Sequence, residues 1–179
     1  MIVALLWFAC ASGPPVSTPV EPVEPLVPVV QQPVVEQDFT GLFSKGEPGF
    51  PAGLETLAFG EDKASIRARH EAVHDYPKPV ADYAFKGRYI LGGALKGFER
   101  VRHTFILRDG VLDEFDLAIP AVAAPAVMEA AWGPADHTGV NATGRPQAIW
   151  AAEELEVVVT EVDDVAIIKF RRPSPTANP

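Results

Sequence analysis

The stretch from Phe98 to Ile119 constrains the fold most, because apolar and polar residues alternate on both sides of an Asp-Gly pair. Apolar side chains recur at every second position toward Leu107, and again from Phe115 to Ile119. This period of two is typical of a strand with one buried face. The pair Asp109-Gly110 favours a tight turn between two such strands. The stretch therefore predicts an antiparallel β-hairpin.

The register of this hairpin depends on the length of its turn. A two-residue turn would pair Phe105 with Glu114 and would place the apolar residues of the two strands on opposite faces. A three-residue loop over 108–110, with Gly110 as a left-handed bulge, keeps them on one face. The longer loop is therefore predicted, with His103 opposite Phe115 and Arg102 opposite Asp116.

The remaining elements of a domain over residues 38–172 follow from periodicity and cap signals. Helices are predicted at 63–74, capped by Asp62, and at 120–132, ended by Gly133 and Pro134. Strands are predicted at 54–59, 82–91, 98–108, 111–119, 147–152, 155–162 and 165–171. A helix followed by three strands thus occurs twice. Two such antiparallel units predict an α+β fold with a helix layer on a β-sheet.

The first twelve residues combine an apolar run with the single cysteine of the chain. Ile2 to Ala9 is apolar, ends at Cys10 and is too short for a bilayer-spanning helix, which takes about 20 residues. It is typical of a secretory signal. The Ala9-Cys10 junction resembles the lipobox of bacterial lipoproteins, which implies lipidation of Cys10. Cleavage by the ordinary signal peptidase and a buried N-terminal strand are the alternatives.

Residues 13–37 carry seven prolines, and Pro19, Pro22, Pro25 and Pro28 recur at every third position. This is the period of the polyproline II helix, so the segment is predicted to be an extended spacer. At about 3.1 Å per residue it could hold a domain roughly 75 Å from a membrane. The alternative is a PxxP ligand for a partner's groove. Residues 173–179 are predicted to be a disordered tail.

Charge and cysteine content exclude several classes of function. The net charge is −9, and all 15 Lys and Arg residues lie at or after Lys45. Nucleic-acid phosphates are bound by basic surfaces, so no nucleic-acid partner is expected. One cysteine permits neither an intramolecular disulfide nor a multi-cysteine zinc site.

Residues 70–74 form the string His-Glu-Ala-Val-His, which resembles the zincin metallopeptidases. On a helix, His70 and His74 would share a face and could hold zinc while Glu71 activates water. Arg67 adds positive charge beside that face, and Pro77 ends the helix within a turn. The prediction is therefore no metal and no cofactor, with a two-histidine site or a peptidase as alternatives.

His103 lies on the apolar face of the hairpin. It is predicted to be a hydrogen-bonded core histidine, and a third zinc ligand is the alternative. No serine or cysteine has a histidine and aspartate at a recognisable spacing, so a covalent nucleophile is not predicted.

Two stretches carry a resemblance to a known family. Val127 to Pro134, VMEAAWGP, is a helix ending in Gly-Pro, and a polar loop, Trp150 and a hairpin follow it. Leu57 to Ile66, LAFGEDKASI, resembles the start of the same unit. Together they resemble the small periplasmic lipoproteins of the SmpA/OmlA type, whose members help outer-membrane β-barrel assembly. The doubled unit is also similar to the β-lactamase inhibitor proteins, which act by surface binding.

These observations predict a membrane-tethered, periplasm-facing lipoprotein of the cell envelope, located at the outer membrane. Its function is predicted to be binding or scaffolding of a protein partner through the sheet face or a loop. Enzymatic activity is not expected, and the alternative function is a zinc metallopeptidase using His70, Glu71 and His74.

Overall fold

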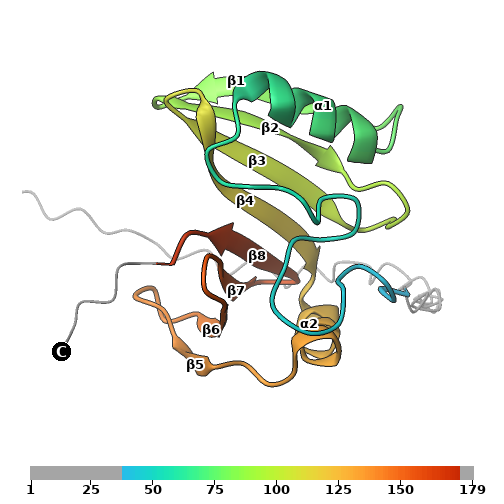
Figure 1. The fold of residues 1–179 in the computed structure, drawn as a ribbon. Coiled ribbons are helices and arrows are strands. Elements are labelled where there is room, and N and C mark those ends of the chain that lie inside the picture. Colours follow the sequence, from blue (N-terminus) through green and yellow to red (C-terminus); the bar gives the residue numbers. More distant parts are fainter. Residues whose placement is uncertain (1–37, 174–179) are drawn as a thin grey trace, which may run out of the picture. The chain divides into compact units, whose positions relative to one another are not determined.

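The structure, a computed structural model, describes residues 38–173. Eight antiparallel strands form one sheet in the order β1-β2-β3-β4-β8-β7-β6-β5 (Figure 1). The strands are β1 (Ala81–Phe85), β2 (Arg88–Ala94), β3 (Arg102–Arg108), β4 (Val111–Pro120), β5 (His137–Val140), β6 (Pro146–Ala151), β7 (Glu156–Val162) and β8 (Val165–Arg171). The helices are α1 (Lys63–Val73), the short 3-10 helix η1 (Ala121–Ala123) and α2 (Ala124–Trp132).

The predicted α+β fold with a helix layer is wrong, because the described residues are mainly β. The chain repeats a helix followed by four strands, not three. The predicted strand at 82–91 is in fact β1 and β2, which a turn at Lys86 and Gly87 separates, and both turn residues have positive φ. The predicted loop before Arg145 contains β5, whose residues are all exposed. Helices of 11 and 9 residues are too short to form a layer over eight strands.

The predicted register of the central hairpin is also wrong. The turn is the two-residue one, with Asp109 and Gly110 both at positive φ and Arg108 opposite Val111. The register then shifts between Ile106 and Leu107. A bulge of this kind inserts one extra residue, which returns the apolar side chains of both strands to one face.

Because of that shift, Phe105 lies opposite Phe115 and His103 lies opposite Leu117. Thr104, rather than Arg102, lies opposite Asp116. The remaining strands of the second half agree with the prediction to within one residue at each end. Residues 54–59, predicted as a strand, form turns.

Helix α1 forms where it was predicted, and both of its ends are attached to the sheet. The side chain of Asp62 caps it by accepting a hydrogen bond from the Ser65 N–H at 2.9 Å. At the start, the Lys63 N–H donates to the carbonyl of Gly110 at 3.1 Å. At the end, the Lys96 N–H donates to the carbonyl of Val73 at 2.8 Å. These bonds fix the height and rotation of α1 over β2 and β3.

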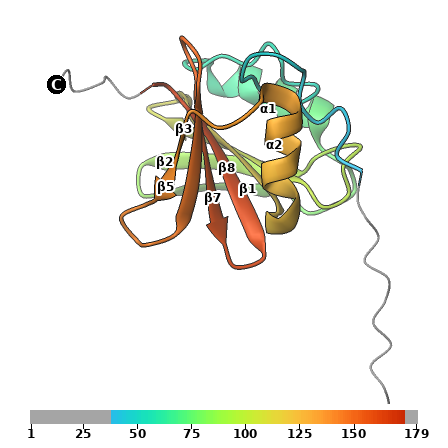
Figure 2. The same ribbon diagram turned by 90° about the horizontal axis from the view of Figure 1, so that it is seen from below.

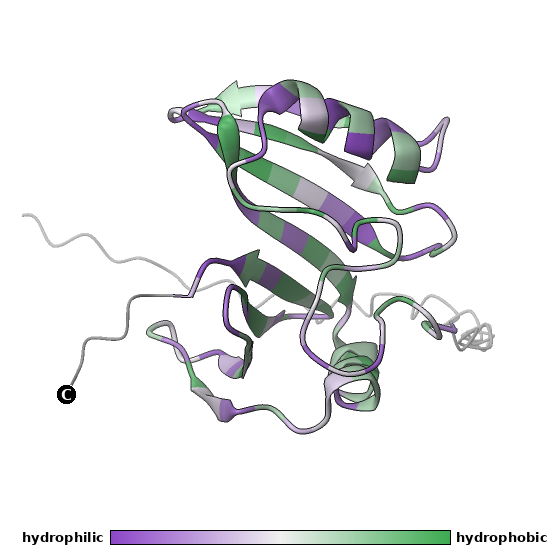
Figure 3. Ribbon diagram, viewed as in Figure 1, coloured by the Kyte–Doolittle hydropathy of each residue, from purple (hydrophilic) through white to green (hydrophobic). Residues whose placement is uncertain are grey.

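The core lies on the face of the sheet that α1 and α2 cover (Figure 2). Alternate residues of β4, and most of those of β3, are buried in it. Figure 3 shows apolar and polar positions as bands along these two strands. Phe115 lies at its centre, with its ring 5.1 Å from Phe105 and 5.4 Å from Phe170. Segment 39–59 packs on the same face through Phe50, whose ring stacks on Phe170.

The opposite face is called the open face here and consists of the outward side chains of β2, β3, β4, β7 and β8. Its residues are Ile90, Thr104, Ile106, Glu114, Asp116, Val158, Ile167 and Lys169. Most of them are half-buried, and Ile106 and Val158 are buried by their neighbours on the sheet.

Several predictions fall on residues that the structure does not describe. These are the signal and lipobox segment at 1–12 with Cys10, the spacer at 13–37, and nearly all of the tail at 173–179. Within residues 38–173, neither helix has the length and apolar character needed to cross a bilayer.

Candidate functional site

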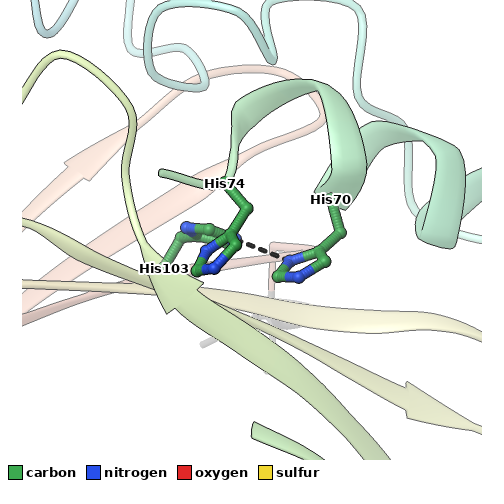
Figure 4. Close-up of side chains that lie close together, drawn as sticks. All are labelled: His70, His74 and His103. Carbon is green, nitrogen blue, oxygen red and sulfur yellow. Dashed lines mark hydrogen bonds between the residues drawn. The ribbon is translucent and has the colours of Figure 1, made fainter. Parts of the chain in front are cut away.

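The structure brings together three histidines that are far apart in sequence (Figure 4). His70 and His74 lie one turn apart at the end of α1 and point toward the sheet. His103 comes from β3, and its Nε2 lies 2.9 Å from Nδ1 of His70. Gly93, on the neighbouring strand β2, leaves room for the imidazole of His74, because a Cβ at this position would lie 2.5 Å from that ring. The three side chains are called the histidine cluster below.

The cluster is compact and buried. Its three side chains are 3%, 2% and 0% exposed for His70, His74 and His103. One ring nitrogen from each residue lies within 4.8 Å of the others. The rings of His70 and His74 stack with centroids 4.9 Å apart, and the ring of Phe105 lies edge-on beside His103.

Hydrogen bonds in the cluster leave two nitrogens without partners. His70 Nδ1 and His103 Nε2 are 2.9 Å apart and share one hydrogen bond, whose donor depends on the tautomer. His70 Nε2 and His103 Nδ1 are buried and have no hydrogen-bond partner among the described residues. A buried polar atom without a partner costs about 1–3 kcal/mol, so these two nitrogens carry a cost that the folded domain has to offset.

His74 differs from His70 and His103, because both of its ring nitrogens lie at hydrogen-bonding distance from backbone carbonyl oxygens. Nδ1 lies 3.1 Å from the oxygen of Ala94, and Nε2 lies 2.9 Å from the oxygen of Lys78. A neutral imidazole has one N–H and can donate to only one of these oxygens. The other nitrogen of a neutral ring then directs a lone pair at an acceptor.

Burial determines the protonation state of His70 and His103. It lowers the pKa of His103 to about 3, with further lowering by His70 and His74. Burial also lowers the pKa of His70, and the carboxylates of Asp82 and Glu71 partly oppose this. Both imidazoles are therefore neutral at pH 7 and keep a lone pair that can bind a metal ion.

The residue predicted as a catalytic base does not join the cluster. Glu71 is exposed on α1, whereas both histidines beside it in the motif are buried. A catalytic zinc site keeps one coordination position open to water and substrate. A pocket in the described residues lies elsewhere, between Phe50, Phe59 and Leu155, and no histidine lines it.

The open face carries a second polar group that lacks a full set of partners. Asp116 has 21% of its side chain exposed, and its Oδ1 has no hydrogen-bond partner among the described residues. Lys169 Nζ lies 2.6 Å from Glu114 but 4.0 Å from Asp116. Burial raises the pKa of Asp116 to about 7, and the charge of Lys169 lowers it only in part.

Comparison with known protein families, with curated proteins and with solved structures finds no match to this chain. The sequence indicated His70 and His74 as a possible ligand pair and predicted His103 to be a core histidine, with a third zinc ligand as the alternative. It gave no signal for Gly93. The one available signal was that His103 stood on the apolar face of the same domain.

Proposed function

We propose that this chain is a membrane-tethered binding or scaffolding protein of the cell envelope, and that its domain recognises a protein partner through the open face. The observation that supports this most is the half-buried carboxylate of Asp116 in the middle of that face, whose Oδ1 has no hydrogen bond among the described residues and lies 4.0 Å from Lys169 Nζ. Thr104 and Lys169 lie opposite it on the neighbouring strands, and the same face carries the buried apolar residues Ile106 and Val158. A partly buried apolar surface around a few polar groups is typical of protein interfaces.

Charge complementarity indicates the chemistry of the partner. In its charged form, the Asp116 carboxylate would accept a hydrogen bond from a Lys or Arg side chain in addition to its 4.0 Å ion pair with Lys169, and such charge-assisted bonds are about twice as strong as neutral ones. The net charge of −9 would also attract a basic partner. The contact is therefore proposed to place a cationic side chain against Asp116.

The geometry favours binding over the alternative of a zinc metallopeptidase. Peptide hydrolysis needs a substrate carbonyl and a water molecule at the metal, within reach of the base. His70 and His74 are buried, and Glu71 is exposed outside the cluster. In the described residues, a peptide substrate thus has no open path to the two histidines of the motif.

Attachment to the membrane is proposed from the sequence, since Cys10 and the spacer at 13–37 lie outside the described residues. Expression of Cys10→Ala in the source cell envelope tests it by fractionation. The variant should move from the membrane pellet to the soluble fraction, because it lacks the lipidated side chain. Unchanged partitioning of Cys10→Ala would exclude a lipid anchor at this residue.

A photo-crosslinking amino acid at Thr104, next to Asp116 on the open face, tests the docking surface. The matched control is the same amino acid at Val122, which is 90% exposed on η1. Position 104 should give a discrete adduct with an envelope protein, and Asp116→Asn in the same chain should weaken it. Equal adducts at both positions, or an adduct insensitive to Asp116, would contradict the proposal.

A further inference from the structure

The histidine cluster is not needed for docking at the open face, and it brings the ring nitrogens of three buried histidines within 4.8 Å of one another. His70 and His103 pack against Phe105, where an apolar side chain would fill the space without burying polar atoms. Three of the four histidines in the chain nevertheless meet there. We propose that His70, His74 and His103 bind one divalent transition-metal ion, with zinc as the probe, in a closed site that stabilises the domain and performs no hydrolysis.

The spacing of the ligand atoms fits such an ion after small movements. Tetrahedral zinc holds imidazole nitrogens at about 2.0–2.1 Å, which places them roughly 3.3 Å from one another. The hydrogen-bonded pair, His70 Nδ1 and His103 Nε2, is 2.9 Å apart and has to open slightly. The ligand atom of His74 lies at most 4.8 Å from either and has to approach. Rotation about the side-chain bonds of His74 supplies this movement.

The lone pairs of the cluster favour a cation over the hydrogen-bonded state. Three neutral imidazoles carry three lone pairs and three N–H groups. Without an ion, one lone pair accepts the bond between His70 and His103, while the other two meet no donor among the described residues. An ion between His70 Nδ1 and His103 Nε2 would use all three lone pairs. The N–H groups at His70 Nε2 and His103 Nδ1 would stay without partners among the described residues. Imidazole nitrogen is a preferred ligand of zinc, copper and nickel.

His74 also has the outer partner that a metal-bound histidine requires. Such a residue donates its second ring N–H to a carbonyl or carboxylate, which fixes its tautomer. When one nitrogen of His74 coordinates the ion, the other still faces the carbonyl of Ala94 or of Lys78. The negative charge of the Asp82 carboxylate raises the pKa of His70, the direction that also favours a cation at this ring.

The closed position of the cluster separates this site from a catalytic one. None of the three side chains is more than 3% exposed. Glu71 is exposed and therefore has no part in holding the ion. We consequently expect zinc binding to be independent of Glu71 and the zinc-bound protein not to cleave peptides.

The test uses the full chain, unfolded with a chelator and refolded with or without zinc chloride, because the folded cluster is buried. After gel filtration, the refolded protein should contain about one zinc ion per chain and should melt at a higher temperature than the metal-free protein. Cobalt(II) in place of zinc should give the visible absorption of a tetrahedral site. No retained zinc and no change in melting temperature would overturn the proposal.

Four variants assign the ligands. His70→Gln and His103→Gln should lower zinc affinity by at least about tenfold. His137→Gln, which alters an exposed histidine on β5, and Glu71→Gln should retain wild-type affinity. Zinc retained in His103→Gln, or lost in His137→Gln, would contradict the assignment.

A ligand variant that fails to fold does not prevent the test. X-ray absorption at the zinc edge of the wild-type protein counts the imidazoles on the ion directly. Three imidazoles support the proposal, and fewer than three overturn it.

Discussion

Asp116 should make the stability of this protein fall as the pH rises toward 7. The unfolded carboxyl has a pKa near 3.8, and burial raises the folded pKa to about 7. Between these two values the folded state binds more protons than the unfolded state does. The stabilising effect of the bound proton is complete below pH 3.8 and is lost as the pH rises through 7.

The size of the effect follows from the two pKa values. The difference between pKa 3.8 and pKa about 7 is about three units, and each unit corresponds to about 1.4 kcal/mol, so the full effect is about 4 kcal/mol. Only the part above pH 5 is sampled in a comparison of pH 5 with pH 8. With allowance for solvent around a side chain that is 21% exposed, about 2–3 kcal/mol is expected over this range.

The assay is urea unfolding of the wild type and of Asp116→Asn at pH 5 and pH 8. The amide cannot ionise. The free energy of unfolding of the variant, relative to that of the wild type, should therefore be about 2–3 kcal/mol higher at pH 8 than at pH 5. Asp163→Asn, an equivalent substitution in the exposed turn between β7 and β8, controls for the loss of one negative charge. If Asp116→Asn and the wild type differ in free energy of unfolding by the same amount at pH 5 and at pH 8, the assigned burial of this carboxyl is refuted.

Two further substitutions test the construction of the histidine cluster. Gly93→Ala should destabilise the protein by about 1–3 kcal/mol in urea unfolding, because the new Cβ would lie 2.5 Å from the ring of His74. The control is Gly139→Ala, whose new Cβ would meet nothing within 4 Å and which should be neutral or slightly stabilising. Asp62→Ala should cost about 1 kcal/mol through loss of the cap on α1, and Asp62→Asn, which keeps an acceptor for the Ser65 N–H, should recover most of it. Equal effects of the two glycine substitutions, or no recovery in Asp62→Asn, would contradict the local geometry.

Sequence reasoning located α1 because its signals are local. Asp62 accepts from the helix start, and the apolar positions recur at helical spacing to Val73. The sequence could not reveal β5, since all of its residues are exposed and give no alternation. It also missed the turn at Lys86, because lysine is uncommon at positive φ and gives no turn signal.

The hairpin shows how a correct pattern can give a wrong register. The alternation established that Phe105 and Phe115 share a face, and the structure agrees. Two turn geometries satisfy that requirement: a three-residue loop, or a two-residue turn with a bulge further along. The chain adopts the second, and the difference moves His103 from Phe115 to Leu117.

Local sequence patterns were enough to predict the two helices, most of the strands, the acidic charge and the His-Glu-Ala-Val-His string on one helix. That His103 joins His70 and His74 follows from the packing of distant segments. Their meeting depends on the pairing of β2 with β3 and on the hydrogen bonds that hold α1 over them. His70 and His103 are 33 positions apart. Local periodicity records which face a residue occupies but not which distant residue lies opposite it.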